Sequence, residues 1–277
     1  MIIKDIIPEI DYEKHGVKRG DNYVHLQLMV SEPCTDDPFP RPAVLILPGG
    51  GYSFLSPREA EPIALAFAAK GFATFVLWYS IVPGEFPAAL LETAWSVNYI
   101  REHADEFNII KNKVAVCGFS AGGHLAASAA TMWNCPEIRN CLGFENGEGR
   151  PDGVILGYPV ISTGEYREWG SINALTGGKA DCDPELCARI SLENAVDKTT
   201  SPVFIWHTFY DDVVDVRNSL AFATALKCSD VSCELHVLPH KWHGLSLCDI
   251  PTGTPREGRL RGVTDWVSNA AEWFYEL

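Results

Sequence analysis

A single serine stands between two glycines where an apolar, strand-like run gives way to a helical pattern. Residues 117–130 read CGFSAGGHLAASAA and follow the apolar run at 114–116. The pattern G-x-S-x-G, made by Gly118, Ser120 and Gly122, suits a tight turn that exposes a nucleophilic hydroxyl, because glycine removes Cβ atoms where strand and helix approach. The start of the helix also favours developing negative charge. A turn whose serine only caps the helix is the alternative.

Three consecutive glycines could supply the hydrogen-bond donors that such a nucleophile needs. They occupy 49–51 in LPGGGYSF, directly after the apolar run 43–48. A loop of this kind can turn its backbone N–H groups into one small cavity and stabilise an oxyanion. A dinucleotide-binding loop is excluded, because G-x-G-x-x-G would need glycine where Phe54 stands. A loose turn without a chemical role is the alternative.

Acidic residues and histidines follow the last two strand-like runs. A serine hydroxyl needs a base to remove its proton, and the base needs an anion to orient it. WHTFYDDVVDVRNS follows one run and LPHKWHGL follows the next, which gives the chain order Ser, Asp, His. Of the histidines, His236 falls inside a strand and His240 in a loop. Together with His243 they lack the helical spacing of a zinc site, so we expect no metal.

Strand and helix signals alternate along the chain. Their order predicts βαβ units and a mostly parallel sheet covered on both faces, which is the α/β class. One helix is marked at both ends, with Ser56 as its cap, Pro57 at its first position, Glu59 completing a capping box, and Gly71 as its stop. Strand-like runs lie at 23–30, 43–48, 73–79, 113–119, 153–160, 202–208 and 233–239, and the main helical patterns lie at 56–71, 87–107, 121–130, 218–228 and 263–277.

One stretch breaks this alternation. Residues 162–200 are polar and rich in turn-forming residues, too long for an ordinary loop and too poor in apolar residues for a domain. We therefore expect an excursion or lid over the carboxyl edge of the sheet. No repeat or linker divides the chain, so residues 1–277 are expected to form a single domain.

Composition excludes several classes of function. The formal net charge of −14 repels a polyanion, so nucleic acid is not an expected partner. The N-terminal residues lack an apolar signal region and no run is long enough to span a membrane, which predicts a protein that is neither secreted nor membrane-bound. Nine cysteines without a C-x-x-C pair favour free thiols in a reducing cytoplasm. The sequence does not indicate an oligomeric state.

The chain resembles the α/β-hydrolases, and within them the small intracellular esterases that include acetyl-xylan and acetyl-oligosaccharide esterases, often called xylanase B-like. The resemblance runs from about residue 40 almost to the end and is carried by five stretches. They are PGGGYSFLSPREAEPIALAFAAKGFA, GFSAGGHLAAS, ILGYPVI, WHTFYDDVVDVRNS and LPHKWHGL. Pro48 stands where many members of the wider superfamily have histidine, which separates the chain from the hormone-sensitive-lipase branch.

The resemblance implies a catalytic triad. Ser120 would be the nucleophile and His243, in WHGL, the base, with His240 and His236 as alternatives for the base. The family's acid lies two residues before a Val-Pro-like pair, which implies Asp211. The chain departs from the pattern by carrying Asp215 in place of the proline, which leaves Asp212 as an alternative acid.

The resemblance also implies an oxyanion hole and an activity. The backbone N–H groups of Gly50, Gly51 and Ala121 would stabilise the oxyanion, with no cofactor. The implied activity is hydrolysis of short-chain, acetyl esters, with acetylated xylo-oligosaccharides as the small-molecule substrate. A serine peptidase or an amidase such as a formamidase, and a non-catalytic binding protein of the same fold, are the alternatives.

Further side chains are expected near this edge of the sheet. Aromatic rings with a few hydrogen-bonding groups suit a sugar ester. We expect Tyr52, Arg58, Tyr79 and Trp242 to contact substrate, with packing as the alternative for the aromatic ones. His124, one turn after Ser120, is expected to pack inside the helix layer.

Overall fold

The strands form one sheet within residues 2–32, 39–253 and 260–277, the residues that the structure, a computed structural model, describes. The eight strands of this described part lie in the order β1-β2-β4-β3-β5-β6-β7-β8. Strand β2 pairs antiparallel with β1 and β4, and the other neighbours pair in parallel. The bounds are β1 (Ile2–Ile6), β2 (His25–Val30), β3 (Arg41–Leu47), β4 (Ala73–Trp78), β5 (Ile109–Phe119), β6 (Gly153–Gly157), β7 (Val203–Tyr210) and β8 (Cys233–Lys241).

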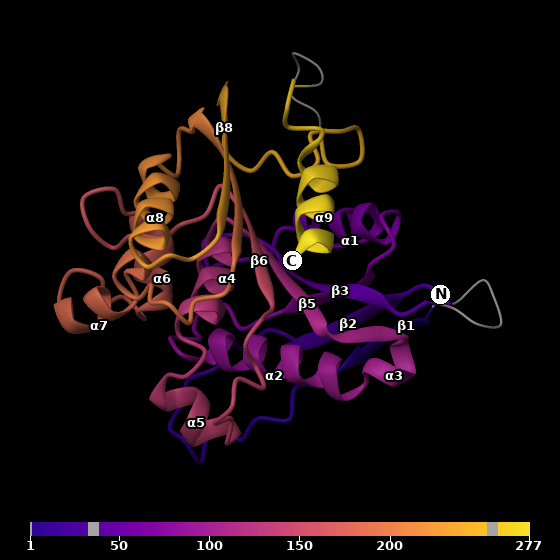
Figure 1. Ribbon diagram of the computed structural model, residues 1–277. Helices are drawn as coiled ribbons and strands as arrows, with labels where there is room; N and C mark the ends of the chain where they lie inside the picture. The colour runs from indigo at the N-terminus through magenta and orange to yellow at the C-terminus, as the bar shows by residue number, and fades with distance from the viewer. Residues whose placement is uncertain (1, 33–38, 254–259) are drawn as a thin grey trace.

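Helices cover both faces of the sheet (Figure 1). Helices α1 and α9 contact each other on one face, and α2, α4 and α8 cover the opposite face. The bounds are α1 (Glu61–Ala68), α2 (Ala88–Glu102), α3 (Ala104–Phe107), α4 (Ala121–Thr131), α5 (Pro136–Leu142), α6 (Trp169–Leu175), α7 (Pro184–Arg189), α8 (Arg217–Cys228) and α9 (Trp266–Glu276), with 3-10 turns η1 (Pro57–Glu59) and η2 (Leu192–Asn194).

Strand β3 illustrates how the sheet separates two apolar clusters. Side chains alternate across a strand, and here both faces are covered. Leu45 and Leu47 join the cluster under α2 and α4, whereas Val44 and Ile46 join the cluster under α1 and α9. All four side chains have 0% exposure. The continuous apolar run in the sequence is therefore the signature of a strand buried on both faces.

The expected α/β class is confirmed, with corrections in detail. The seven expected strands are present, and β1 and α5 were not expected. The helix expected at 56–71 is divided into η1 and α1, and Ser56 makes no side-chain capping bond. The capping box fails because the Glu59 side chain turns inward, where it accepts hydrogen bonds from other elements.

The stretch 162–200 leaves the sheet as expected, but it is not only loop. It contains α6, α7 and η2. Ile172, Ile190 and Leu192 are fully buried and attach the stretch to the cluster under α4. These few apolar anchors were too widely spaced to indicate helices in the sequence.

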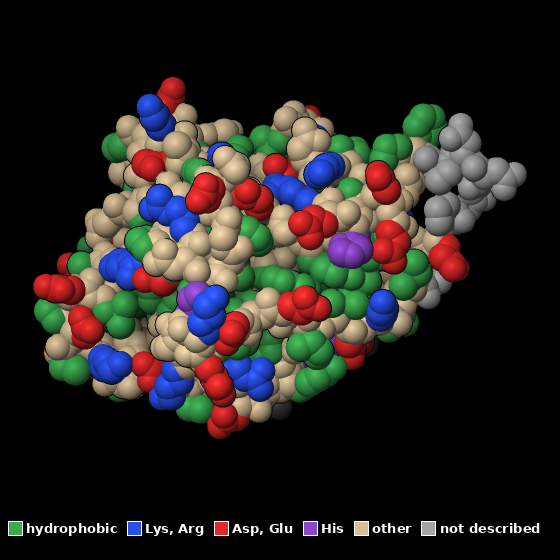
Figure 2. Space-filling view, turned by 90° about the horizontal axis from the view of Figure 1, so that it is seen from below, with side chains coloured by type: hydrophobic (Ala, Val, Ile, Leu, Met, Phe, Trp, Pro, Cys, Tyr) green, Lys and Arg blue, Asp and Glu red, His purple; other side chains and the backbone are tan. Residues whose placement is uncertain are grey.

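One face of the molecule shows how its charged side chains are distributed. The face seen from below in Figure 2, where α2 and α5 lie, shows acidic and basic side chains interspersed. Within the described ranges, none of the helices is both long and apolar enough to cross a membrane. The eight cysteines in these ranges are free thiols, and Cys34 lies outside the described residues.

Candidate active site

Ser120 lies in the turn between β5 and α4 and has an unusual backbone conformation. Its φ is 52° and its ψ is −117°, in a region that L-residues rarely adopt. The turn is possible because its neighbours lack side chains. A Cβ on Gly122 would lie 2.2 Å from the Leu47 carbonyl oxygen, and one on Gly118 would lie 2.0 Å from the Gly122 oxygen. The two glycines of the motif are therefore required by close packing.

His243 brings the serine and an aspartate together. It lies just beyond β8, with its Nε2 2.8 Å from Ser120 Oγ and its Nδ1 2.8 Å from Asp211 Oδ2. Because an ionised carboxylate only accepts hydrogen bonds, Nδ1 of the neutral ring carries the proton and donates to Asp211. The other nitrogen, Nε2, is then free to accept the Ser120 proton. This tautomer is the one that a general base requires.

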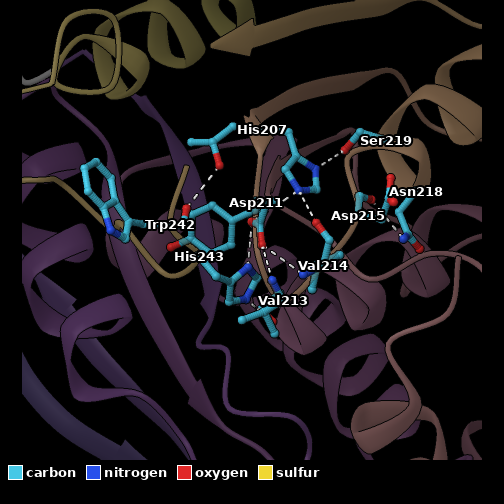
Figure 3. Close-up of polar contacts among 12 residues, drawn as sticks. His207, Asp211, Val213, Val214, Asp215, Asn218, Ser219, Trp242 and His243 are labelled. Carbon is cyan, nitrogen blue, oxygen red and sulfur yellow. Dashed lines mark hydrogen bonds and ion pairs between the residues drawn. The ribbon is translucent and has the colours of Figure 1, made fainter. Parts of the chain in front are cut away.

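Asp211 is held as an ionised carboxylate at the end of β7. Its Oδ1 accepts the amide N–H groups of Val213 and Val214, each at 2.9 Å, and its Oδ2 faces His243 (Figure 3). Burial alone would raise the pKa of Asp211, but the hydrogen bonds from His207 and His243 outweigh it and hold that pKa well below its usual value. The negative charge therefore persists beside the His243 ring.

His207 is a supporting residue that the sequence analysis did not identify. It is fully buried in β7, with Nε2 3.0 Å from the Val214 oxygen and 3.4 Å from Asp211 Oδ2. Its Nδ1 faces Ser219 Oγ at 2.7 Å (Figure 3). The ring thus fixes the turn that carries Asp211. The only signal in the sequence was a histidine within an apolar strand, four residues before the acid. Such a histidine is equally typical of a core residue.

The alternative residues from the sequence lie elsewhere. Asp212 is exposed, and it is the Asp211 carboxylate that bonds His243. His236 Nε2 faces Glu234 at 2.6 Å, and His240 Nε2 faces the Arg261 oxygen at 2.9 Å. The three histidines of this region therefore have separate partners. Among the described residues, no group of His, Cys, Asp and Glu side chains is arranged to hold a metal ion.

The backbone amides of the glycine loop and of the start of α4 differ in their hydrogen bonding. Gly49 donates its N–H to the Glu59 carboxylate at 2.9 Å, whereas no hydrogen bond among the described residues uses the N–H of Gly50, Gly51 or Ala121. Gly50 and Gly51 have φ values of 132° and 62°, which glycine adopts without strain. Ala121 opens α4, so its amide is one of the unpaired donors of a helix start. The three expected oxyanion donors are thus without a partner in the part of the chain that the structure describes.

A cavity of about 580 Å³ opens over Ser120 and His243. Phe54, 61% exposed, and Val213, 55% exposed, provide apolar walls. Polar groups come from Ser53, Ser56, Arg58, Glu59, Glu168 and Ser171. A second depression of about 680 Å³, lined in part by Arg101 and Trp133, contains none of the triad residues. The cavity over Ser120 and His243 is therefore the one that a reacting group would enter.

The expected substrate-contacting residues divide into two groups. Tyr52 and Tyr79 are core residues, not cavity residues, since their hydroxyls bond His124 Nδ1 at 3.0 Å and the Pro48 oxygen at 2.5 Å. The Trp242 ring lies outside the cavity lining and away from Asp211 (Figure 3). Arg58 does line the cavity, with its Nε bonded to the Thr252 oxygen. We therefore withdraw Tyr52, Tyr79 and Trp242 as substrate contacts.

His124 lies in the helix layer, where the sequence analysis expected it. Its Nε2 is 2.9 Å from the Ile190 oxygen, so that nitrogen carries the proton and Nδ1 accepts from Tyr52. Burial lowers the pKa of His124 to about 4. The ring is a neutral packing element that joins α4 to the stretch 162–200.

That stretch also reaches the cavity. Glu168 caps the start of α6, and its carboxylate accepts hydrogen bonds from the N–H of Gly170 at 2.9 Å, the N–H of Ser171 at 2.7 Å and the Ser171 hydroxyl at 2.5 Å. Glu168, Gly170 and Ser171 line the cavity. The excursion expected over the carboxyl edge of the sheet therefore supplies part of the cavity wall.

These features define the molecule as an α/β hydrolase. A serine in a strained turn after a central strand, with an acid and a histidine after the last two strands, is the arrangement of that fold. Solved structures agree. An acetyl ester-xyloside bifunctional hydrolase from Caldicellulosiruptor lactoaceticus superposes with a TM-score of 0.79 at 34% identity, covering 93% of this chain and 89% of that one. A carboxylesterase from Lactobacillus plantarum superposes with a TM-score of 0.81 at 26% identity over 100% and 98%.

The chain belongs to the BD-FAE family, whose model matches residues 32–226. It is 37% identical over 218 residues to endo-1,4-beta-xylanase B of Butyrivibrio fibrisolvens, covering 77% of this chain and 34% of that protein. It is 32% identical over 207 residues to an acetylxylan esterase of Xylanibacter ruminicola, covering 73% of this chain and 40% of that protein. The chain thus spans well under half the length of these two curated relatives. The resemblance to acetylxylan esterases is confirmed, and the chain is an esterase-like α/β hydrolase.

Proposed function

We propose that this protein is a serine carboxylesterase that removes short acyl groups, acetyl above all, from xylo-oligosaccharides or related sugars. The observation that carries the proposal is the continuous hydrogen-bond chain from Ser120 through His243 to Asp211. That chain opens into a cavity whose neighbouring amide donors are unsatisfied within the described residues. This arrangement supports the roles of nucleophile, base, acid and oxyanion donors that acyl transfer requires.

Acylation is the first half of the reaction. His243 Nε2 accepts the Ser120 proton as Oγ attacks the ester carbonyl carbon, and Asp211 stabilises the imidazolium that forms. The N–H groups of Gly50, Gly51 and Ala121 donate to the oxyanion, each contributing on the order of 3 kcal/mol to the lowering of the barrier. The carbonyl then re-forms, and the alcohol leaves with the proton from His243.

Deacylation repeats these roles with water. His243 removes a proton from a water molecule, which attacks the acyl-serine carbonyl. The same backbone donors stabilise the second oxyanion. The acid product departs as Ser120 regains its proton from His243, and the free enzyme is restored.

The proposed substrate class is supported by the cavity and by the relatives. Phe54 and Val213 offer apolar surfaces against which a sugar ring can pack, while Glu168 and Arg58 offer groups that hydroxyls can bond. Two of the similar proteins are named as an acetylxylan esterase and as an acetyl ester-xyloside hydrolase. A neutral acetylated sugar also suits a chain with a net charge of −14, which disfavours anionic substrates.

The test is a substrate panel with the wild type, Ser120→Ala and His243→Ala. Release of p-nitrophenol from the acetate, butyrate and octanoate esters measures acyl length, and acetate release from acetylated xylo-oligosaccharide measures the proposed substrate. We expect both acetyl substrates to be cleaved by the wild type and neither variant to exceed about a thousandth of its rate.

Other outcomes would redirect the assignment. Aryl ester cleavage without acetate release from the oligosaccharide keeps the esterase and removes the sugar substrate. Faster cleavage of p-nitroacetanilide than of the acetate ester indicates an amidase. Undiminished hydrolysis by Ser120→Ala contradicts the mechanism, and an inactive wild type that binds the acetylated oligosaccharide indicates a binding protein.

A further inference from the structure

A buried carboxylate beside the triad has no role in the acyl-transfer steps. Glu59, in the turn η1, is 4% exposed. Burial of a carboxylate is costly unless hydrogen bonds compensate for the lost water. Glu59 meets this condition by accepting one bond on each oxygen, from two different parts of the site.

The first bond fixes the oxyanion loop. Gly49 donates its N–H to Glu59 Oε2 at 2.9 Å, and its oxygen accepts the Ser56 N–H at 2.9 Å. The packing here is tight, because a Cβ on Gly49 would lie 2.7 Å from Glu59 Oε2 and 3.2 Å from Ser120 Cβ. Glu59 therefore sets the orientation of the peptide that precedes the donors Gly50 and Gly51.

The second bond leads to the loop that carries the base. Tyr158 donates its hydroxyl to Glu59 Oε1 at 2.6 Å and accepts the Ser246 N–H at 3.0 Å. The Tyr158 ring packs edge-on against His243, with 4.9 Å between ring centroids. Ser246 also contacts the same turn, because its hydroxyl donates a hydrogen bond to the Arg58 oxygen at 2.5 Å. Glu59 and Tyr158 thus connect η1 to residues 243–246.

We propose that Glu59 is a positioning residue that holds the oxyanion loop and the His243 loop in one geometry. The inference rests on the proposed function. The donors of Gly50 and Gly51 and the Nε2 of His243 must converge on one acyl carbon, although they come from the ends of β3 and β8. Their separation is set by the path from Gly49 through Glu59 and Tyr158 to Ser246, so a change in Glu59 displaces donors relative to the base without altering either.

The test compares Glu59→Ala, Glu59→Gln and Tyr158→Phe, with Glu92→Gln as the matched control. Glu92 is another buried carboxylate, bonded to the Ser80 amide at 2.7 Å, the Ser80 hydroxyl at 2.5 Å and the Tyr12 hydroxyl at 2.9 Å. It does not line the cavity. For each variant, kcat and KM for p-nitrophenyl acetate and the urea midpoint of unfolding are measured.

Misplaced oxyanion donors reduce the stabilisation of the transition state more than they reduce the affinity for substrate. We expect Glu59→Ala to lower kcat by about 10- to 100-fold with KM changed less than about threefold. Glu59→Gln keeps the side-chain shape and one acceptor, so it should recover part of the loss, and Tyr158→Phe should lose at least about fivefold in kcat. Glu92→Gln should lower the urea midpoint and leave kcat within about twofold.

Three results would overturn the inference. The first is a kcat within about twofold of the wild type in both Glu59 variants and in Tyr158→Phe. The second is a loss of kcat in Glu92→Gln equal to that in the Glu59 variants, which would show that the effect is one of general stability. If Glu59→Ala does not fold, Glu59→Gln and Tyr158→Phe decide by the same criteria. The third is an inactive wild type, which contradicts the proposed function as well, whereas an active wild type with unaffected variants contradicts this inference alone.

Discussion

Replacing Asp211 by asparagine tests how the triad aspartate acts. Asp211→Asn retains the side-chain shape, so the oxygen that accepts the amides of Val213 and Val214 can stay in place. The introduced NH2 group then faces His243 Nδ1. Because this group donates, Nδ1 must accept, and the ring proton moves to Nε2. A ring in that tautomer cannot take the Ser120 proton.

The magnitude follows from the geometry of the pair. The 2.8 Å contact joins a side chain with 0% exposure to a ring with 16% exposure, so solvent screening is weak. At an effective dielectric constant of about 20, the carboxylate stabilises the imidazolium by about 6 kcal/mol. Removal of this charge corresponds to a loss of about 10⁴-fold in kcat.

The assay is hydrolysis of p-nitrophenyl acetate at neutral pH, with Asp212→Asn as the control. Asp212 is exposed and adjacent, so its replacement removes the same charge without touching His243. We expect Asp212→Asn to remain within about twofold of the wild type. A loss below about tenfold in Asp211→Asn, or an equal loss in both variants, would refute the reasoning.

Three further expectations concern packing, pH and specificity. Gly122→Ala places a Cβ 2.2 Å from the Leu47 oxygen and should cost more than about 2 kcal/mol, so an unchanged urea midpoint would contradict the packing argument. Burial lowers the pKa of His124 to about 4, so as pH falls below about 6.5 the unfolded chain binds a proton that the folded chain does not. Between pH 7 and pH 4 this residue alone should lower the free energy of unfolding by about 3 kcal/mol, and that part of the acid loss should disappear in His124→Gln. Glu168→Gln should reduce kcat/KM for acetylated xylo-oligosaccharide by about 3- to 10-fold and leave p-nitrophenyl acetate within twofold, and equal effects on both would remove Glu168 from sugar recognition.

Local patterns in the sequence were sufficient for seven of the eight described strands and for Ser120. Each central strand is a short apolar run, because both of its faces are buried, and such runs are visible without coordinates. Ser120 could be found because its turn demands glycine on both sides at fixed spacing. Asp211 and His243 lie 32 residues apart and meet only because β7 and β8 are neighbours, so the sequence offered candidates and the resemblance to a family selected among them.

Residues whose roles depend on long-range partners could not be predicted. Glu59 fits the pattern of a helix capping box, yet its carboxylate bonds Tyr158, 99 residues away. Tyr52 and Tyr79 lie in segments of the sequence that were expected to line the cavity, but their rings are buried in the core and do not reach it. Propensity and spacing describe the backbone, whereas the direction of a side chain depends on which space the packed elements leave free.

The central claim is that Ser120 carries the acyl group during turnover. The most direct measurement is mass spectrometry of peptides from enzyme mixed with p-nitrophenyl acetate and quenched with acid in the steady state. We expect an acetyl group on the peptide that contains Ser120, depleted when substrate is exhausted and absent in Ser120→Ala. The claim would be contradicted if substrate is turned over but no acetylated Ser120 peptide is found, either in the wild type or in His243→Ala, which should deacylate slowly. Acetylation only at another residue would contradict it as well.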